Sequence, residues 1–140
     1  MINVILKGVD EFLGSHVESL LTPKIASICK VSNDDVVFTC LHSIIYHGGV
    51  DQTSYHMIVT FELEEKYLLF VKELANFVLE ASKSFAVHCH ISFTYLNKPY
   101  YQRIEKDYPL YVTMENDVSI EENEENEEIY TGDIFANFKD

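Results

Sequence analysis

The stretch MINVILKG, residues 1–8, decides the fold because it is the first element of a pattern that the chain repeats. Ile2, Val4 and Leu6 alternate with other residues, and Gly8 follows directly. An apolar period of two that ends at a glycine is typical of a half-buried strand and its turn. We therefore expect a strand to begin within the first residues.

A helical pattern follows this strand. Apolar residues between positions 13 and 28 recur three and four apart, which predicts a helix from about Asp10. Ser15 opens a sequence that resembles a capping box directly after Gly14, so we expect the helix to restart there. Pro23 lies inside the pattern and is expected to kink the helix, because proline lacks a backbone donor.

The rest of the body repeats this order. The turn residues Asn33-Asp34-Asp35 precede a β-rich stretch at 36–46, and an alternating stretch occupies 54–63. A broad amphipathic pattern at 67–83 predicts a second helix, and alternation at 87–95 predicts a last strand. Two βαβ units with right-handed crossovers predict an α/β fold of the α+β type. We expect a two-layer sandwich with a four-stranded mixed sheet and both helices on one face.

Length and charge define three segments. A chain of 140 residues that is 47% hydrophobic is long enough for one domain, which we place at residues 1–114. That body holds 13 acids and 9 bases, whereas residues 115–140 hold 10 acids and one base. Residues 115–128 read as an acidic low-complexity linker, and residues 129–140 as an apolar docking segment for this protein or for a protein partner.

Composition also limits the classes of partner and the location. The net charge of −13 disfavours nucleic acid and anionic membranes as partners. The chain has neither an apolar run of about 20 residues nor a signal-peptide pattern, so we expect a cytoplasmic protein. The three cysteines have no CxxC spacing, which argues against a disulfide framework and against a structural zinc site.

The order of these elements resembles the tautomerase and macrophage migration inhibitory factor superfamily, and in particular a bacterial branch of it. The resemblance rests on the early first strand closed by Gly8, the 33–36 entry to the second strand, the Gly48-Gly49 turn and the Tyr- and Lys-rich stretch at 93–101. It covers residues 1 to about 101. It implies a homotrimer in which the uncovered sheet faces enclose a central barrel, with a small-molecule site at the subunit interface.

The resemblance also implies a chemistry that this sequence alters. In the family an N-terminal proline serves as general base or acid, and the matching position here is Ile2. A bulky second residue normally prevents methionine removal, so we expect the primary amine of Met1 at the terminus, displaced by about one strand residue, ~3.3 Å. A general base needs hydrogen-bond reach, so proline-dependent activity is not expected.

The remaining site residues follow from the same resemblance. Met1 and Lys30 are the candidate catalytic groups, and Ile2, Lys30, His88 and His90 are the candidate binding residues, with no cofactor and no metal. The family's carboxylate-binding arginines have no counterpart, because the sole arginine, Arg103, follows the last strand.

Three patterns also permit bolder interpretations. His88 and His90 could ligate zinc with His42 or His56, but a polar surface is the preferred interpretation. The pair Glu62 and Glu64 could serve acid–base chemistry, but acids before a helix are favoured by its dipole, so a capping role is the preferred interpretation. The pair Tyr100-Tyr101 could stack on an aromatic substrate, but packing or a subunit contact is preferred.

Two functions stay open at this stage. The first is a trimer that binds a small molecule or a protein and lacks proline-dependent activity. The second is an isomerase or tautomerase with an altered mechanism that acts on a small keto-enol substrate.

Overall fold

A computed structural model describes residues 1–99 and 101–105, which belong to one compact unit, Met1–Lys106. The linker expected at 115–128 and the docking segment expected at 129–140 lie outside the described residues. Within the described part of the chain, no helix is long and apolar enough to cross a membrane.

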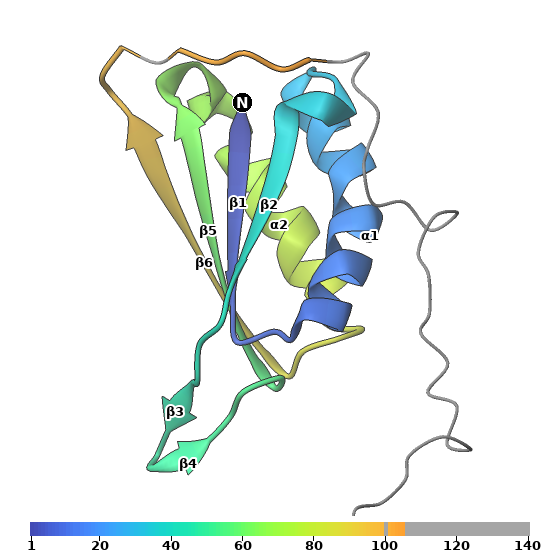
Figure 1. Cartoon of the computed structure of the whole chain (residues 1–140), viewed down its shortest axis with the longest axis vertical. Helices are drawn as coiled ribbons and strands as arrows, with labels where there is room; N and C mark the ends of the chain where they lie inside the picture. Colours follow the sequence, from blue (N-terminus) through green and yellow to red (C-terminus); the bar gives the residue numbers. More distant parts are fainter. Residues whose placement is uncertain (100, 106–140) are drawn as a thin grey trace, which may run out of the picture. The chain divides into compact units, whose positions relative to one another are not determined.

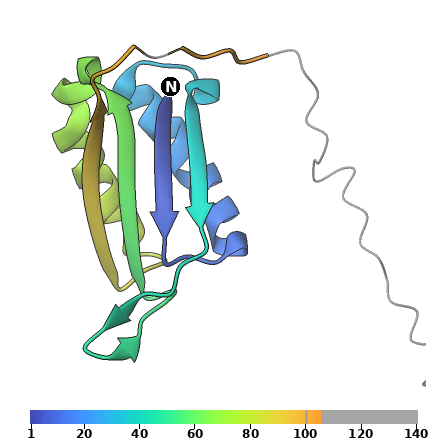
Figure 2. The same cartoon turned by 60° about the vertical axis from the view of Figure 1, so that its left-hand side comes forward.

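The main sheet has four strands in the order β2-β1-β5-β6. These strands are β2 (Val36–Leu41), β1 (Ile2–Lys7), β5 (His56–Glu64) and β6 (His88–Leu96). β1 runs parallel to β2 and antiparallel to β5, and β5 runs parallel to β6, so the sheet is mixed. Figures 1 and 2 show α1 (Glu11–Cys29) and α2 (Val71–Ser82) on the same face of this sheet. The two-layer arrangement expected from the sequence is confirmed.

The core lies between the sheet and the helices. Alternation in β1 and β5 turns every second side chain toward the helices, which contribute their apolar stripes. The fully buried side chains are Ile2, Val4, Leu6, Val17, Leu21, Ile25, Met57, Val59, Phe61, Leu63, Leu74 and Val78. The Phe61 ring also stacks on the Phe93 ring of β6, with centroids 5.2 Å apart. The opposite face of the sheet is covered by no helix of the described chain.

α1 is continuous, so the expected restart at Ser15 is wrong. Asp10 is the N-cap, because its carboxylate accepts a hydrogen bond from the Leu13 backbone N–H at 2.8 Å. Gly14 lies within the helix, where a Cβ would stand 2.4 Å from Cys40 Sγ of β2. The glycine therefore permits close packing of helix on strand rather than breaking the helix. The helix also continues through Pro23 as far as Cys29.

Two further elements differ from the sequence prediction. The strand expected at 36–46 ends at Leu41, and its last residues join a separate hairpin of β3 (Tyr46–His47) and β4 (Val50–Asp51). Gly48 and Gly49 have φ angles of 60° and 77°, which suit the tight turn between these strands. The 3₁₀ helix η2 (Glu65–Phe70) precedes α2, so the second α-helix begins at Val71 rather than near Tyr67.

We expect Gly8→Ala to destabilise the protein more than Gly49→Ala. Both glycines have positive φ angles, 79° and 77°, so both substitutions carry a similar backbone strain. Only at Gly8 would the new Cβ collide with neighbours, because it would lie 2.3 Å from the backbone oxygen of His56. Urea unfolding at pH 7.5 should show a loss of about 1 kcal/mol for Gly49→Ala and at least ~2 kcal/mol for Gly8→Ala. Equal losses would contradict the close approach of Gly8 to β5.

Candidate functional site

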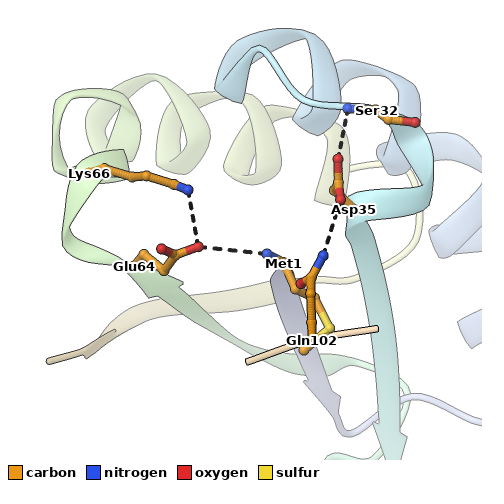
Figure 3. A network of polar contacts seen from close by, with 6 residues as sticks. All are labelled: Met1, Ser32, Asp35, Glu64, Lys66 and Gln102. Carbon is orange, nitrogen blue, oxygen red and sulfur yellow. Dashed lines mark hydrogen bonds and ion pairs between the residues drawn. The ribbon is translucent and has the colours of Figure 1, made fainter. Parts of the chain in front are cut away.

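A cavity of about 550 Å³ lies at the end of the sheet where β1 begins. Its lining residues come from the start of β1, the segment that connects α1 to β2, the end of β5, η2 and the segment after β6. They are Met1, Lys30, Val31, Ser32, Asp35, Glu64, Lys66, Tyr67 and Gln102. Figure 3 shows six of them in two sets of polar contacts, one that joins Lys66, Glu64 and Met1 and one that joins Gln102, Asp35 and Ser32.

The end of α1 positions one wall of the cavity. Lys30 caps the helix in a left-handed conformation, with φ 58° and ψ 44°, and its N–H donates to the carbonyls of Ala26 and Ser27. This turn carries the chain into the 3₁₀ helix η1 (Asn33–Asp35), for which Ser32 is the N-cap. The Ser32 N–H in turn donates to Asp35 Oδ2 at 3.2 Å. The reciprocal bonds fix Asp35 beside the cavity.

Charged groups form the opposite wall. The amine nitrogen of Met1 lies 3.8 Å from Glu64 Oε1, and Lys66 Nζ lies 3.2 Å from the same oxygen. The hydrogen bond to Glu64 raises the pKa of Lys66 above its ordinary value. One carboxylate oxygen therefore has two cationic partners, and Figure 3 shows both contacts.

Glu64 does not have the capping role that its sequence position suggested. It precedes η2, but its side chain makes no capping hydrogen bond and instead contacts the Met1 amine. Glu62 also has a different partner, because its Oε2 accepts a hydrogen bond from the Asn3 amide at 2.8 Å. The two acids are therefore not a pair held for acid–base chemistry.

Gln102 completes the site from a distant part of the sequence. Its side-chain amide donates to Asp35 Oδ1 at 3.5 Å, so the segment after β6 reaches the end of the sheet where β1 begins. No sequence pattern indicated this residue, because Gln102 lies in no periodic element. Ser32 and Asp35 did carry a signal, since serine followed three residues later by an acid is a capping pattern.

Lys30 is the cation of the cavity that has no acidic partner among the described residues. None of the ion pairs found at residues 1–99 and 101–105 includes it. Its Nζ lies 5.9 Å from the centroid of the Phe70 ring, within the range of a cation–π contact. An ammonium group without a carboxylate partner, at the edge of a polar cavity, is suited to hold an anionic ligand.

The structure brings together only some of the residues that the sequence suggested. Met1 and Lys30 line the same cavity, whereas Ile2 is fully buried in the core and is not one of the lining residues. His88 and His90 lie at the other end of the sheet, because β5 runs antiparallel to β1 and His88 pairs with the first residue of β5. Within one chain, the two histidines are therefore distant from the cavity.

Other candidate residues have different surroundings. Arg103 does not line the cavity and pairs with Glu105 at 3.2 Å. Tyr101 is 90% exposed, and Tyr100 lies outside the described residues. Across residues 1–99 and 101–105, no group of three or more His, Cys, Asp or Glu side chains is arranged to hold a metal ion.

Solved structures of other proteins have a similar fold. A domain of unknown function from Sebaldella termitidis aligns with a TM-score of 0.64 over 73% of this chain and 95% of its own, at 14% identity. A macrophage migration inhibitory factor-like protein from Entamoeba histolytica aligns with a TM-score of 0.56 over 71% of this chain and 94% of its own, at 10% identity. The chain has the fold of the tautomerase and macrophage migration inhibitory factor superfamily.

A third solved structure has the same architecture. This tautomerase-like chain aligns with a protein of unknown function from Vibrio cholerae with a TM-score of 0.53, at 11% identity, over 72% of this chain and 83% of that one. No family model matches the sequence, and no curated protein is similar to it. At these identities the likeness establishes the tautomerase-like fold, and the function has to be argued from the site.

Proposed function

We propose that this tautomerase-like chain binds a small anionic molecule, such as an α-keto acid, in the cavity at the start of β1 and lacks proline-dependent tautomerase activity. The observation that carries the proposal is that two cationic groups, Lys30 and the Met1 amine, line the same cavity. Of these, Lys30 has no acidic partner in the described chain. A volume of about 550 Å³ is within the range of small-molecule sites.

The surroundings of the terminus support binding over proline-type catalysis. Proline-dependent tautomerases use a secondary amine in an apolar pocket, whereas the amine of Met1 is primary and lies near the Glu64 carboxylate. A general base needs a free lone pair directed at the reacting proton, and the partner of this amine in the described chain is a carboxylate. The side chain of Ile2 is fully buried, which opposes a shift of β1 along the sheet that would place Ile2 at the cavity.

An isomerase with an altered mechanism is the second candidate. Its support is the position of the Met1 amine inside the cavity and the contact of Glu64 with two cations, which offers a route for a proton between the amine and a carboxylate. A keto-enol substrate would then exchange its proton with the primary amine of Met1. This chemistry would be weaker than that of a preorganised proline.

The open sheet face supports a homotrimer. Strand register places Val37, Thr39 and Leu41 of β2 on the side away from the helices, and Val37 and Leu41 are 40% and 42% exposed. Both edge strands, β2 and β6, also lack a partner on one side within the described chain. A trimer would cover these groups and would bring the open face of one subunit to the cavity of another.

Lys30→Gln should weaken the binding of an anionic keto acid about ten- to hundredfold, because it removes a charge-assisted hydrogen bond worth roughly 1.5–3 kcal/mol. We suggest phenylpyruvate as the probe and NMR titration of the labelled protein as the measurement. Lys72→Gln is the matched control, since Lys72 is exposed on α2 and does not line the cavity. Equal affinities in the two variants would contradict an anion site at Lys30.

The wild-type protein should show little tautomerase activity on phenylpyruvate, as measured by enol absorbance. A proline codon inserted after the start codon would give Met1→Pro once the methionine is removed, and it would keep the buried Ile2 in place. The same insertion with alanine gives Met1→Ala, which restores processing without a secondary amine. We expect activity to rise in Met1→Pro and not in Met1→Ala. Wild-type activity as high as that of Met1→Pro would favour the isomerase candidate.

Light scattering at micromolar concentration should give three times the mass of one 16.2 kDa chain. Val37→Glu should dissociate the trimer, because it places a charge on the face that becomes buried. Leu69→Glu is the control, since Leu69 is 86% exposed in η2, which is outside that face. A wild-type monomer would overturn the trimer and leave the cavity within one chain as the whole binding site.

A further inference from the structure

Four histidines gather at the end of the sheet opposite the cavity. The rings of His56 and His90 are stacked, with centroids 4.6 Å apart and planes at 12°. The His88 ring lies 5.3 Å from the His56 ring, and the His47 ring lies 5.7 Å from His56 and 6.2 Å from His88. We call these four residues the histidine cluster.

Strand register explains why these rings meet. His56 pairs with His88 across β5 and β6, and His90 pairs with Ile58, so all three imidazoles lie on the open face. His47 joins them from a different element, the hairpin formed by β3 and β4. The cluster therefore connects the main sheet to the hairpin.

No hydrogen-bond acceptor in the described chain contacts His56 Nδ1 at the centre of the cluster. His56 is only 8% exposed, and its Nδ1 has no hydrogen-bond partner. Protonation would create a buried N–H donor and a positive charge with no acceptor beside it. Burial lowers the pKa of His56 below its ordinary value, and His90, His88 and His47 lower it further.

The neighbouring elements supply no neutralising carboxylate. β1 contributes Lys7, a cation whose register partner is Ile58 on the same face, and β4 contributes Asp51, whose carboxylate accepts a hydrogen bond from the Thr53 N–H. β3 and β6 contribute the other three histidines. No ion pair in the described part of the chain includes a histidine.

The hairpin depends on contacts outside itself. β3 and β4 pair with each other and with no strand of the main sheet, and Figure 1 shows them projecting beyond the end of that sheet. Tyr46 and Val50 are 67% and 58% exposed, so the hairpin buries little apolar surface of its own. A two-stranded hairpin of this kind is marginal in water without further packing.

We propose that the histidine cluster is an acid-sensitive latch, in which neutral imidazoles hold the β3–β4 hairpin against the sheet at neutral pH and protonation releases it in mild acid. The contacts of the His47 ring with His56 and His88 hold the hairpin in place. Repulsion between protonated imidazoles in the cluster would break these contacts.

The direction of the pH dependence follows from proton binding. The pKa of His56 is lowered in the latched state, so the released state binds more protons once the pH falls below about 6.5. The latch is therefore fully fastened above that pH and loosens as the pH falls toward the depressed pKa of His56.

Hydrogen exchange of the full chain at pH 7.5 and pH 5.0, corrected for intrinsic exchange rates, tests the latch. We expect protection of the amides at 46–51 to fall in acid, because the released state is the one that binds the additional protons. The protection of β1 and β5 should fall less. A hairpin equally protected at both values of pH would overturn the proposal.

Two variants distinguish repulsion between the imidazoles of the cluster from a general loss of stability in acid. The variant His90→Gln changes an exposed side chain that makes no ring contact with His47, so it should fold and lose less hairpin protection at pH 5.0 than the wild type. His47→Gln should leave protection of the hairpin low and independent of pH. His16→Gln is the control, because His16 is exposed on α1 and should leave the wild-type response unchanged. An acid response in His90→Gln as large as in the wild type would also overturn the latch.

Discussion

The structure depends on the central position of β1, which is paired on both sides and buried along one face. Ile2, Val4 and Leu6 are fully buried under the helices, while β2 and β5 hydrogen-bond to its two edges. A slip of one residue would turn these three side chains to the open face, so the register is firmly fixed. The same register fixes the Met1 amine at the cavity. Core packing and site geometry are therefore consequences of one constraint.

The fold was predictable because its signals are local and repeated. Period-two stretches became β1, β5 and β6, and period-3.6 stretches became α1 and α2. The errors arose where tertiary contacts override a local signal. Gly14 suggests a helix break, but the close approach of Cys40 requires a residue without a side chain inside the helix. Similarly, the apolar residues before Gly48 continue the strand pattern, although the two glycines build a separate hairpin.

The candidate site was less predictable, because its residues come from the ends of elements that are distant in sequence. The resemblance indicated Met1 and Lys30, and both line the cavity. Glu64 was assigned to capping because only its position before η2 is visible in the sequence, and its partner Met1 is 63 residues away. Ile2 was expected beside Met1, but adjacent residues of a strand face opposite sides, so one lines the cavity and the other fills the core.

The two ends of the sheet differ in how their charges are balanced, and this difference bears on function. At the cavity, Glu64 sits between the amine of Met1 and Lys66, so those cations are held in place, and Lys30 is left to meet a ligand. At the other end, four imidazoles lie together without a carboxylate partner in the described chain. The first arrangement leaves one cation, Lys30, without a carboxylate partner in the described chain, and it suits binding. The second surrounds His56, whose pKa is lowered by burial and by its neighbours, with three further imidazoles, and it suits regulation. If the open face of one subunit reaches the cavity of the next, as in the proposed trimer, the histidine cluster and the cavity would meet in one site. Ligand binding and the pH response would then be thermodynamically linked.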